Sequence, residues 1–161
     1  MINFINIEGW AFKDTIQVAL TIGITLLTYA IVYSLKPKLQ IVCACWDSGK
    51  NQIKIKIKNI GRWDAVNLRI EVCAVDINKR YTYHFEVDHN EFLILPSGRN
   101  GKDNVKTFKV SDVAESVKKY NISYDYLILK LTRNKYKLRV RVHSYHSFSG
   151  LGKAEEEYLP L

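Results

Sequence analysis

The sequence predicts an all-β domain, an antiparallel sandwich or small barrel, that follows a single transmembrane α-helix. Three observations support this prediction. Residues 15–35 form a run of twenty-one uncharged residues, and a helix of that length covers the roughly 30 Å hydrocarbon thickness of a bilayer. From residue 39 onward, polar and apolar residues alternate with the two-residue period of β-strands. Clusters of Asp, Asn, Ser, Gly and Pro separate the alternating segments, which is typical of turns.

The chain therefore divides into four parts. Residues 1–14 are apolar but too short to span a bilayer, so we expect them to lie along the membrane surface. Residues 15–35 form the transmembrane helix, and residues 36–146 form the β-domain. Residues 147–161 are a tail with two glycines and three successive glutamates, to which no single conformation is assigned.

Two other interpretations of residues 15–35 are a buried helix of a soluble protein and a secretory signal peptide. A chain of 161 residues has little room for a second core around so long a helix. The apolar part of a signal peptide is about 7–15 residues long and ends in small residues, whereas Tyr33 stands near the end of this run. Trp10 and Tyr29 are at positions that suit the membrane interface, and Lys36 and Pro37 end the helix. The sequence therefore favours a retained anchor.

Charge predicts the orientation of this single-pass protein. Residues 1–35 carry one basic and two acidic groups, and the remaining 126 residues carry 23 basic and 14 acidic groups. The positive-inside rule then places the amino terminus outside and the carboxy-terminal domain in the cytoplasm. An odd set of cysteines (Cys43, Cys45 and Cys73) agrees with a reducing compartment.

The β-domain is expected to contain seven or eight short strands. The clearest is residues 52–58, where Ile53, Ile55 and Ile57 alternate with lysines. Asp112 followed by Glu115 resembles a capping box and predicts a short helical turn. The expected strands are residues 39–46, 52–58, 66–74, 81–87, 92–95, 105–110, 126–131 and 137–145, the last two forming a closing pair.

Residues 53–72 also resemble a known family. Asn59, Gly61, Ala65 and Asn67, embedded in alternating aliphatic strands, resemble the Asn-x-Gly…Ala-x-Asn hairpin of CARDB or NEW3-type immunoglobulin-like domains. The resemblance covers about twenty residues. It implies an immunoglobulin-like sandwich used for adhesion or assembly, without catalysis.

No catalytic signature is found, so we predict a protein that is not an enzyme and has no catalytic residues and no cofactor. The sequence lacks a Gly-x-Ser-x-Gly elbow, a Gly-rich phosphate loop and a His-Glu-x-x-His pair. Cys43 and Cys45 share one strand face, but zinc would need two further ligands that the spacing does not supply. We expect small apolar cysteines in a reduced core and no metal site.

Two basic stripes are candidate anion-binding sites. One interpretation is a solvated face, since lysines commonly protect sheet edges. The other is attraction to acidic headgroups, a nucleotide or an acidic partner, and a membrane tether favours headgroups. No recognised nucleic-acid module accompanies the charge, so specific nucleic-acid binding is not expected. The candidates are Lys54, Lys56 and Lys58 on one strand, and Lys135, Lys137, Arg139, Arg141 and His143 on or near another.

Polar residues inside the helix predict association within the membrane. Gln17, Thr21, Thr25 and Thr28 recur at steps that keep them on one helix face. Such a face gains interhelical hydrogen bonds against a second copy or another membrane helix. The alternative is that the threonines are satisfied by their own backbone.

The leading functional hypothesis is a non-enzymatic, membrane-anchored binding or assembly module that faces the cytosol. A second hypothesis is a membrane-disrupting effector of bacterial antiphage signalling, whose basic β-domain senses a cyclic nucleotide; the similarity to such effectors is in architecture alone. A third is an accessory subunit of a larger membrane complex.

Overall fold

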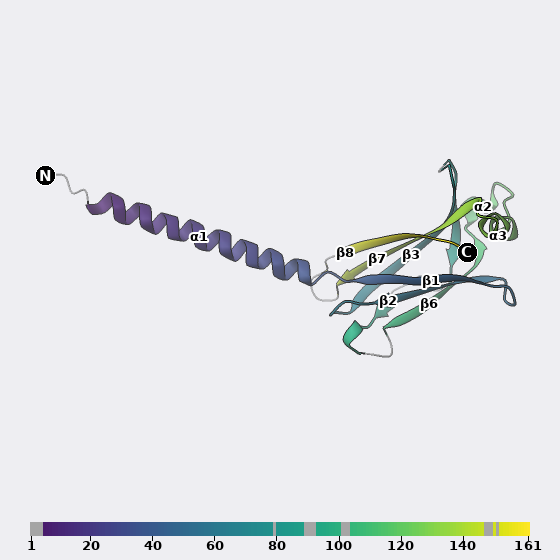
Figure 1. The fold of residues 1–161 in the computed structure, drawn as a ribbon, viewed down its shortest axis with the longest axis horizontal. Coiled ribbons are helices and arrows are strands. Elements are labelled where there is room, and N and C mark those ends of the chain that lie inside the picture. Colours follow the sequence, from purple (N-terminus) through teal and green to yellow (C-terminus); the bar gives the residue numbers. More distant parts are fainter. Residues whose placement is uncertain (1–4, 79, 89–92, 101–103, 147–149, 151) are drawn as a thin grey trace. The chain divides into compact units, whose positions relative to one another are not determined.

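The computed structural model of this protein describes residues 5–78, 80–88, 93–100, 104–146, 150 and 152–161. The chain divides after Leu35 into two compact units, residues 1–35 and residues 36–161. The first unit is a long helix and the second is built mostly from antiparallel strands (Figure 1).

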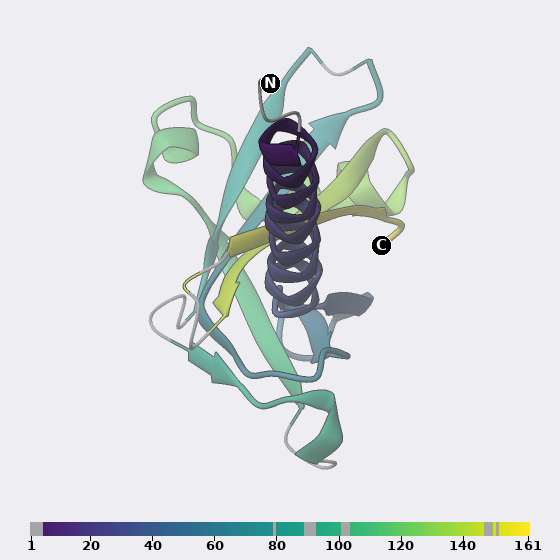
Figure 2. The same ribbon diagram turned by 90° about the vertical axis from the view of Figure 1, so that its left-hand side faces the viewer.

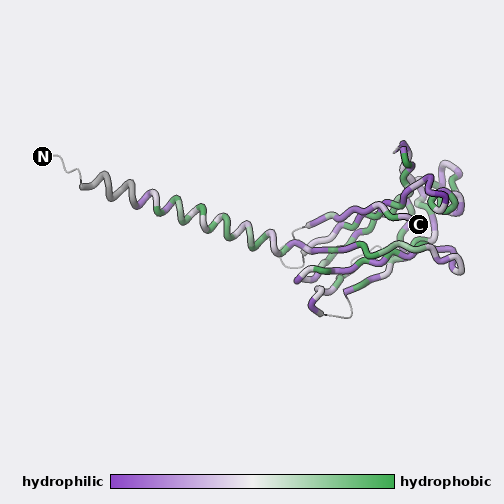
Figure 3. Tube along the Cα trace, in the orientation of Figure 1, coloured by the Kyte–Doolittle hydropathy of each residue, from purple (hydrophilic) through white to green (hydrophobic). Residues whose placement is uncertain are grey.

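Helix α1 (Ile5–Ser34) makes up the first unit. Within it, Lys13–Ser34 is 22 residues long and apolar enough to cross a membrane, and it is the one such helix among the described residues. A signal sequence meets the same criteria. Figure 3 shows apolar residues along most of this segment, whereas polar and apolar residues intermix in the β-domain. An apolar helix near the amino terminus is therefore confirmed, and it continues back from the predicted span to Ile5 without a break. Residues 1–4 of the predicted surface segment lie outside the described residues.

The second unit is a nearly closed antiparallel barrel. Its strands follow the order β1-β2-β6-β4-β3-β7-β8, with β5 paired to β3, and the two end strands β1 and β8 contact each other. The strands are β1 (Leu39–Asp47), β2 (Gln52–Asn59), β3 (Ala65–Asp76), β4 (Thr82–Val87), β5 (Leu93–Leu95), β6 (Val105–Val113), β7 (Tyr136–His146) and β8 (Gly152–Leu159). The helical elements are η1 (Gly98–Asn100), α2 (Glu115–Lys118) and α3 (Tyr124–Thr132).

Strand β4 forms the corner between two opposing sheets (Figures 1 and 2). Its first half pairs with β3, where His84 lies opposite Cys73 and Thr82 opposite Val75. Its second half pairs with β6, where Phe85 lies opposite Val113. One sheet is therefore β1-β2-β6, the other is β3-β7-β8 with β5, and the hydrophobic core fills the space between them.

The alternation of apolar and polar residues along the strands explains which side chains form this core. Ile53, Ile55 and Ile57 of β2 are completely buried, and so are Val140 and Val142 of β7 in the opposing sheet. Burying each such side chain contributes about 1.5–3 kcal/mol. The prediction of a mostly antiparallel β-fold behind one apolar helix is confirmed. The immunoglobulin-like type is not established by this strand order.

The connection that carries the family resemblance is not a hairpin. Strand β2 pairs with β1 and β6, and β3 pairs with β4, β5 and β7, so the chain changes sheets between them. Asn59, which is fully buried, holds this corner together. Its side-chain amide donates to the carbonyls of Trp63 (2.9 Å) and Leu95 (3.0 Å), and its side-chain oxygen accepts from the N–H of Gly61 (2.9 Å).

The predicted strand at residues 126–131 is wrong, because these residues belong to helix α3. Ser123 caps the helix by accepting a hydrogen bond from the N–H of Tyr126. Leu127, Ile128 and Leu131 are buried, and their spacing places them on one helix face. Five to six apolar residues fit a short strand and a short helix equally well by periodicity.

The tail was also predicted incompletely. Residues 152–159 form β8, which pairs with β7 from Tyr145↔Gly152 to Leu138↔Leu159. The β-domain therefore extends beyond residue 146. Residues 147–149 and 151 lie outside the described part of the chain.

Two local predictions need correction for different reasons. The capping box is absent: α2 is capped by Ala114 without a side-chain hydrogen bond, and Asp112 instead accepts from the N–H of Val113 (2.7 Å). In β1, an extra residue between Ile41 and Cys43 shifts the register. Leu39 and Ile41 face the core, but Cys43 and Cys45 lie opposite Lys56 and Lys54 on the outer face. The prediction that these two thiols are core residues is therefore wrong.

Candidate functional site

The first candidate site is a cationic surface on the outer side of the β1-β2-β6 sheet. Lys54, Lys56 and Lys58 alternate with the buried isoleucines of β2, so their side chains leave the sheet on its solvent side. The register places Lys109 of β6 opposite Lys54. We name Lys54, Lys56, Lys58 and Lys109 the lysine face.

Most of the charge on the lysine face is uncompensated. Lys54 pairs with Asp47 at 2.5 Å, and this hydrogen bond holds the pKa of the Asp47 carboxyl below its usual value. Lys56, Lys58 and Lys109 form no ion pair with any residue that the structure describes. Three neighbouring ammonium groups without counter-charges form a local surface that attracts anions.

The second predicted stripe lies on the opposing sheet, and neighbouring acids compensate part of it. Glu156 of β8 accepts a hydrogen bond from Nε of Arg141 at 2.7 Å, and this contact lowers the pKa of the Glu156 carboxyl. Glu71 of β3 lies 3.8 Å from Nε2 of His143. Lys135 and Lys137 form no ion pair within the described residues. The structure therefore separates the two predicted stripes, and it leaves the lysine face as the less compensated of the two.

The guanidinium group of Arg139 contacts a thiol and not a carboxylate. It donates to Sγ of Cys73 over 3.6 Å, and Nδ1 of His84 lies 3.2 Å from the same sulfur. Burial raises the pKa of the Cys73 thiol, although Arg139 opposes that shift. The thiol is therefore protonated and buried, which does not suit a nucleophile. Among the residues that the structure describes, no group of three or more His, Cys, Asp or Glu side chains could hold a metal ion. His89 and the side chain of His146 lie outside that description.

In helix α1 the four predicted association residues are not equivalent. The hydroxyls of Thr21, Thr25 and Thr28 donate to carbonyls of their own helix at 2.7–2.8 Å. Their polarity is thus satisfied within the helix. The side chain of Gln17 is exposed and forms no hydrogen bond with a described residue. Gln17 is therefore the member of this set whose side chain has no hydrogen-bond partner among the described residues.

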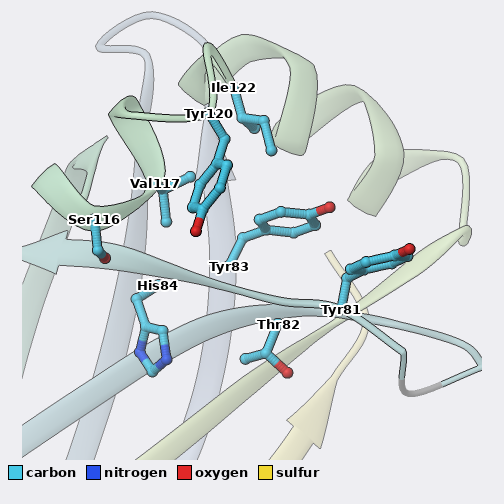
Figure 4. Close-up of a pocket in the computed structure, with 8 residues that line it drawn as sticks. All are labelled: Tyr81, Thr82, Tyr83, His84, Ser116, Val117, Tyr120 and Ile122. Carbon is cyan, nitrogen blue, oxygen red and sulfur yellow. The ribbon is translucent and has the colours of Figure 1, made fainter.

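Sequence reasoning missed a second candidate site, which we name the tyrosine groove. It has a volume of about 500 Å³ and lies between β4 and the segment containing α2. Figure 4 shows Tyr81 and Tyr83 on one side of β4, facing Tyr120, while Thr82 and His84 project from the other side of the strand. The rings of Tyr81 and Tyr83 stack with centroids 6.4 Å apart, and Tyr120 is 76% exposed. The full lining is Tyr81, Thr82, Tyr83, His84, Ser116, Val117, Tyr120 and Ile122.

Comparisons with known proteins do not place the chain in a family. No protein-family model matches it. It is 25% identical over 127 residues to a probable RNA-dependent RNA polymerase 5 from Arabidopsis thaliana; the match covers 75% of this chain but only 13% of that protein. Among solved structures, S. aureus TarS matches with 12% identity and a TM-score of 0.31, covering 77% of this chain and 17% of the other. Neither likeness carries an argument about function.

Proposed function

We propose that this protein is a non-enzymatic, membrane-anchored binding module whose β-domain faces the cytosol and binds anions through the lysine face. The observation that carries the proposal is the set of three uncompensated lysines on one sheet face. Helix α1 supplies the anchor, with the amino terminus outside as the charge distribution favours. The proposal keeps the hypothesis that this β-domain is related to CARDB or NEW3-type immunoglobulin-like domains.

The short connection favours a ligand at the membrane surface. Residues 35–38 separate the end of α1 from the start of β1, and four residues span at most about 14 Å when fully extended. The cytoplasmic leaflet carries acidic headgroups, and each Lys close to that surface is worth about 1 kcal/mol. Three lysines then supply about 3 kcal/mol, or roughly a hundredfold in affinity.

Vesicle capture tests this proposal with the full-length protein. The protein is reconstituted into nanodiscs of phosphatidylcholine and mixed with separate vesicles, with or without phosphatidylserine. We expect capture of the phosphatidylserine vesicles alone. Combining Lys56→Gln, Lys58→Gln and Lys109→Gln should weaken that capture about a hundredfold. A control with the same loss of charge combines Arg133→Gln, Lys135→Gln and Lys137→Gln, and it should retain capture.

Other outcomes would contradict the proposal. Equal losses in both variants would mean that net charge, and not the lysine face, is responsible. Binding of a cyclic dinucleotide to the lysine face without vesicle capture would favour the nucleotide-sensing alternative. Release of the protein from native membranes by alkaline carbonate would remove the anchor on which the proposal depends.

The proposal includes association through α1, which depends on Gln17. Gln17→Leu should weaken the association of labelled copies in vesicles, measured by energy transfer, about threefold to thirtyfold, since an interhelical hydrogen bond contributes about 0.6–2 kcal/mol. Thr25→Val is the matched control, because the Thr25 hydroxyl is already bonded to its own helix. Unchanged energy transfer in the Gln17 variant would contradict this part of the proposal.

A further inference from the structure

We propose that the tyrosine groove binds an extended, acidic peptide segment of a partner protein, which adds as a strand along the free edge of β4. This inference goes beyond the proposed function, and it concerns a different surface from the lysine face. It follows from the main-chain groups of β4, the walls of the groove and the charges at its rim.

The main chain of β4 is unpaired where it borders the groove. The N–H of Asp76 donates to the carbonyl of Tyr81 at 3.1 Å, so Tyr81 directs its main-chain groups toward β3. In an antiparallel pair the residues alternate, so the main-chain groups of Thr82 and His84 point away from β3. The carbonyl of His84 accepts from the N–H of Ala114 at 2.9 Å. At Thr82 no described residue occupies the corresponding position, because β6 pairs with β4 only at residues 85–87.

If β6 continued past Ala114 it would run beside Thr82, but the strand ends before this point, so the position next to Thr82 stays open. The chain leaves β6 at Ala114 and turns into α2. The groove lies between this turn and the edge of β4, and its volume is in the range of ligand sites. Thr82 and His84 line the groove although their side chains project from the other side of β4 (Figure 4). The strand itself therefore forms one wall, as in proteins that bind peptides by strand addition.

Tyr83 of β4 and the segment that contains α2 supply contacts for the side chains of such a peptide. Tyr83 is half-buried and packs on Tyr136 with ring centroids 5.8 Å apart, which fixes its position. Val117 and Ile122 add apolar surface, and Tyr120 is exposed above them. The groove follows four consecutive residues, 81–84, a length of about 13 Å in extended chain. An elongated site of this kind suits an extended segment better than a compact ligand.

Charge at the rim selects an acidic segment. Arg80 precedes Tyr81 and Lys119 precedes Tyr120; both are exposed, and neither forms an ion pair with a described residue. Two acids near α2, Asp112 and Glu115, share one cation, since Lys118 contacts them at 2.7 Å and 3.0 Å. Arg80 and Lys119 therefore offer two exposed cations next in sequence to tyrosines that line the groove, and these cations complement glutamate or aspartate in the occupant.

The test uses a fluorescent, acetylated octapeptide of alternating glutamate and valine, titrated into the full-length protein in phosphatidylcholine nanodiscs. We expect saturable binding. Thr82→Pro removes the free N–H at an edge position where proline is tolerated, and it should weaken binding about fivefold or more, whereas Thr82→Ala keeps the N–H and should bind like the original protein. Tyr120→Ala should weaken binding by a similar factor, and Tyr145→Ala, at an exposed tyrosine outside the groove, should not.

Three outcomes would overturn the inference. The first is no binding at peptide concentrations up to about 1 mM, a level that detects even very weak complexes. The second is equal binding by the Thr82→Pro and Thr82→Ala proteins, which would exclude main-chain pairing. The third is equal binding of a peptide in which lysine replaces glutamate. Each result is independent of vesicle capture by the lysine face, so the two proposals can fail separately.

Discussion

Replacing Asn59 by alanine is expected to lower the free energy of unfolding by about 3–5 kcal/mol. The side chain is fully buried at the corner between β2 and β3 and satisfies the carbonyls of Trp63 and Leu95 and the N–H of Gly61. Alanine would leave the two carbonyls without that partner, whereas the N–H of Gly61 would keep its second bond to the carbonyl of Lys38 (3.1 Å). Each buried unsatisfied group costs about 1–3 kcal/mol. Urea unfolding of the full-length protein in detergent, followed by tryptophan fluorescence, measures the change.

Asn78→Ala is the control for this experiment. Asn78 is exposed, and its own N–H rather than its side chain bonds to Asp76. Its replacement should change the free energy of unfolding by less than about 0.5 kcal/mol. A loss below about 1 kcal/mol in Asn59→Ala would show that the corner does not depend on this side chain.

Tyr124→Phe should destabilise the domain by about 2–4 kcal/mol although the ring is retained. The Tyr124 hydroxyl donates to the carbonyl of Val110 at 2.8 Å and accepts from the N–H of Ile53 at 3.1 Å. It thus bridges β2 and β6 inside the barrel, and phenylalanine would leave both main-chain groups unsatisfied. Tyr126→Phe is the matched control, because Tyr126 is exposed and its hydroxyl forms no hydrogen bond within the described residues.

The same hydroxyl makes this difference depend on pH. Burial raises the pKa of Tyr124 to about 12, while a tyrosine in the unfolded chain ionises near pH 10. The contribution of Tyr124 to stability is therefore fully present below pH 10 and is lost as the pH rises from 10 to 12. The gap in unfolding free energy between the original protein and Tyr124→Phe should shrink across that interval. Tyr136, whose pKa is also raised to about 12, titrates in both proteins, so its effect on the unfolding free energy cancels in the difference between them. A constant gap would contradict this assignment.

The strands that could be predicted from sequence are those whose alternation is local. Strand β2 is one example, since a single strand with isoleucines on one side and lysines on the other defines its own buried face. Strand β8 is the opposite case. Its successive glutamates resemble a solvated tail, and its place in the sheet depends on pairing with β7, including the contact of Glu156 with Arg141. Such long-range pairing leaves no periodic pattern in the strand itself.

The candidate site shows the same division. Lys54, Lys56 and Lys58 of the lysine face follow directly from strand alternation and were predicted. Lys109 and the acidic neighbours of Arg141 and His143 were not. These acids come from other strands, Glu71 from β3 and Glu156 from β8. The tyrosine groove was missed because Tyr120 follows α2 and reaches β4 only through the fold. Alternating tyrosines at positions 81 and 83 were visible in the sequence, but they resembled an ordinary strand.

The extra residue in β1 determines which thiols of this protein are chemically addressable. With regular alternation Cys45 would share the inward side of Leu39 and Ile41; with the shifted register it is exposed and directly opposite Lys54. Cys73 is buried and its raised pKa keeps it protonated. Maleimide reagents at neutral pH therefore have native attachment points at the exposed Cys45 and the half-buried Cys43 on the same face, so that a dye there reports on ligands arriving at the neighbouring ammonium groups without any engineered substitution.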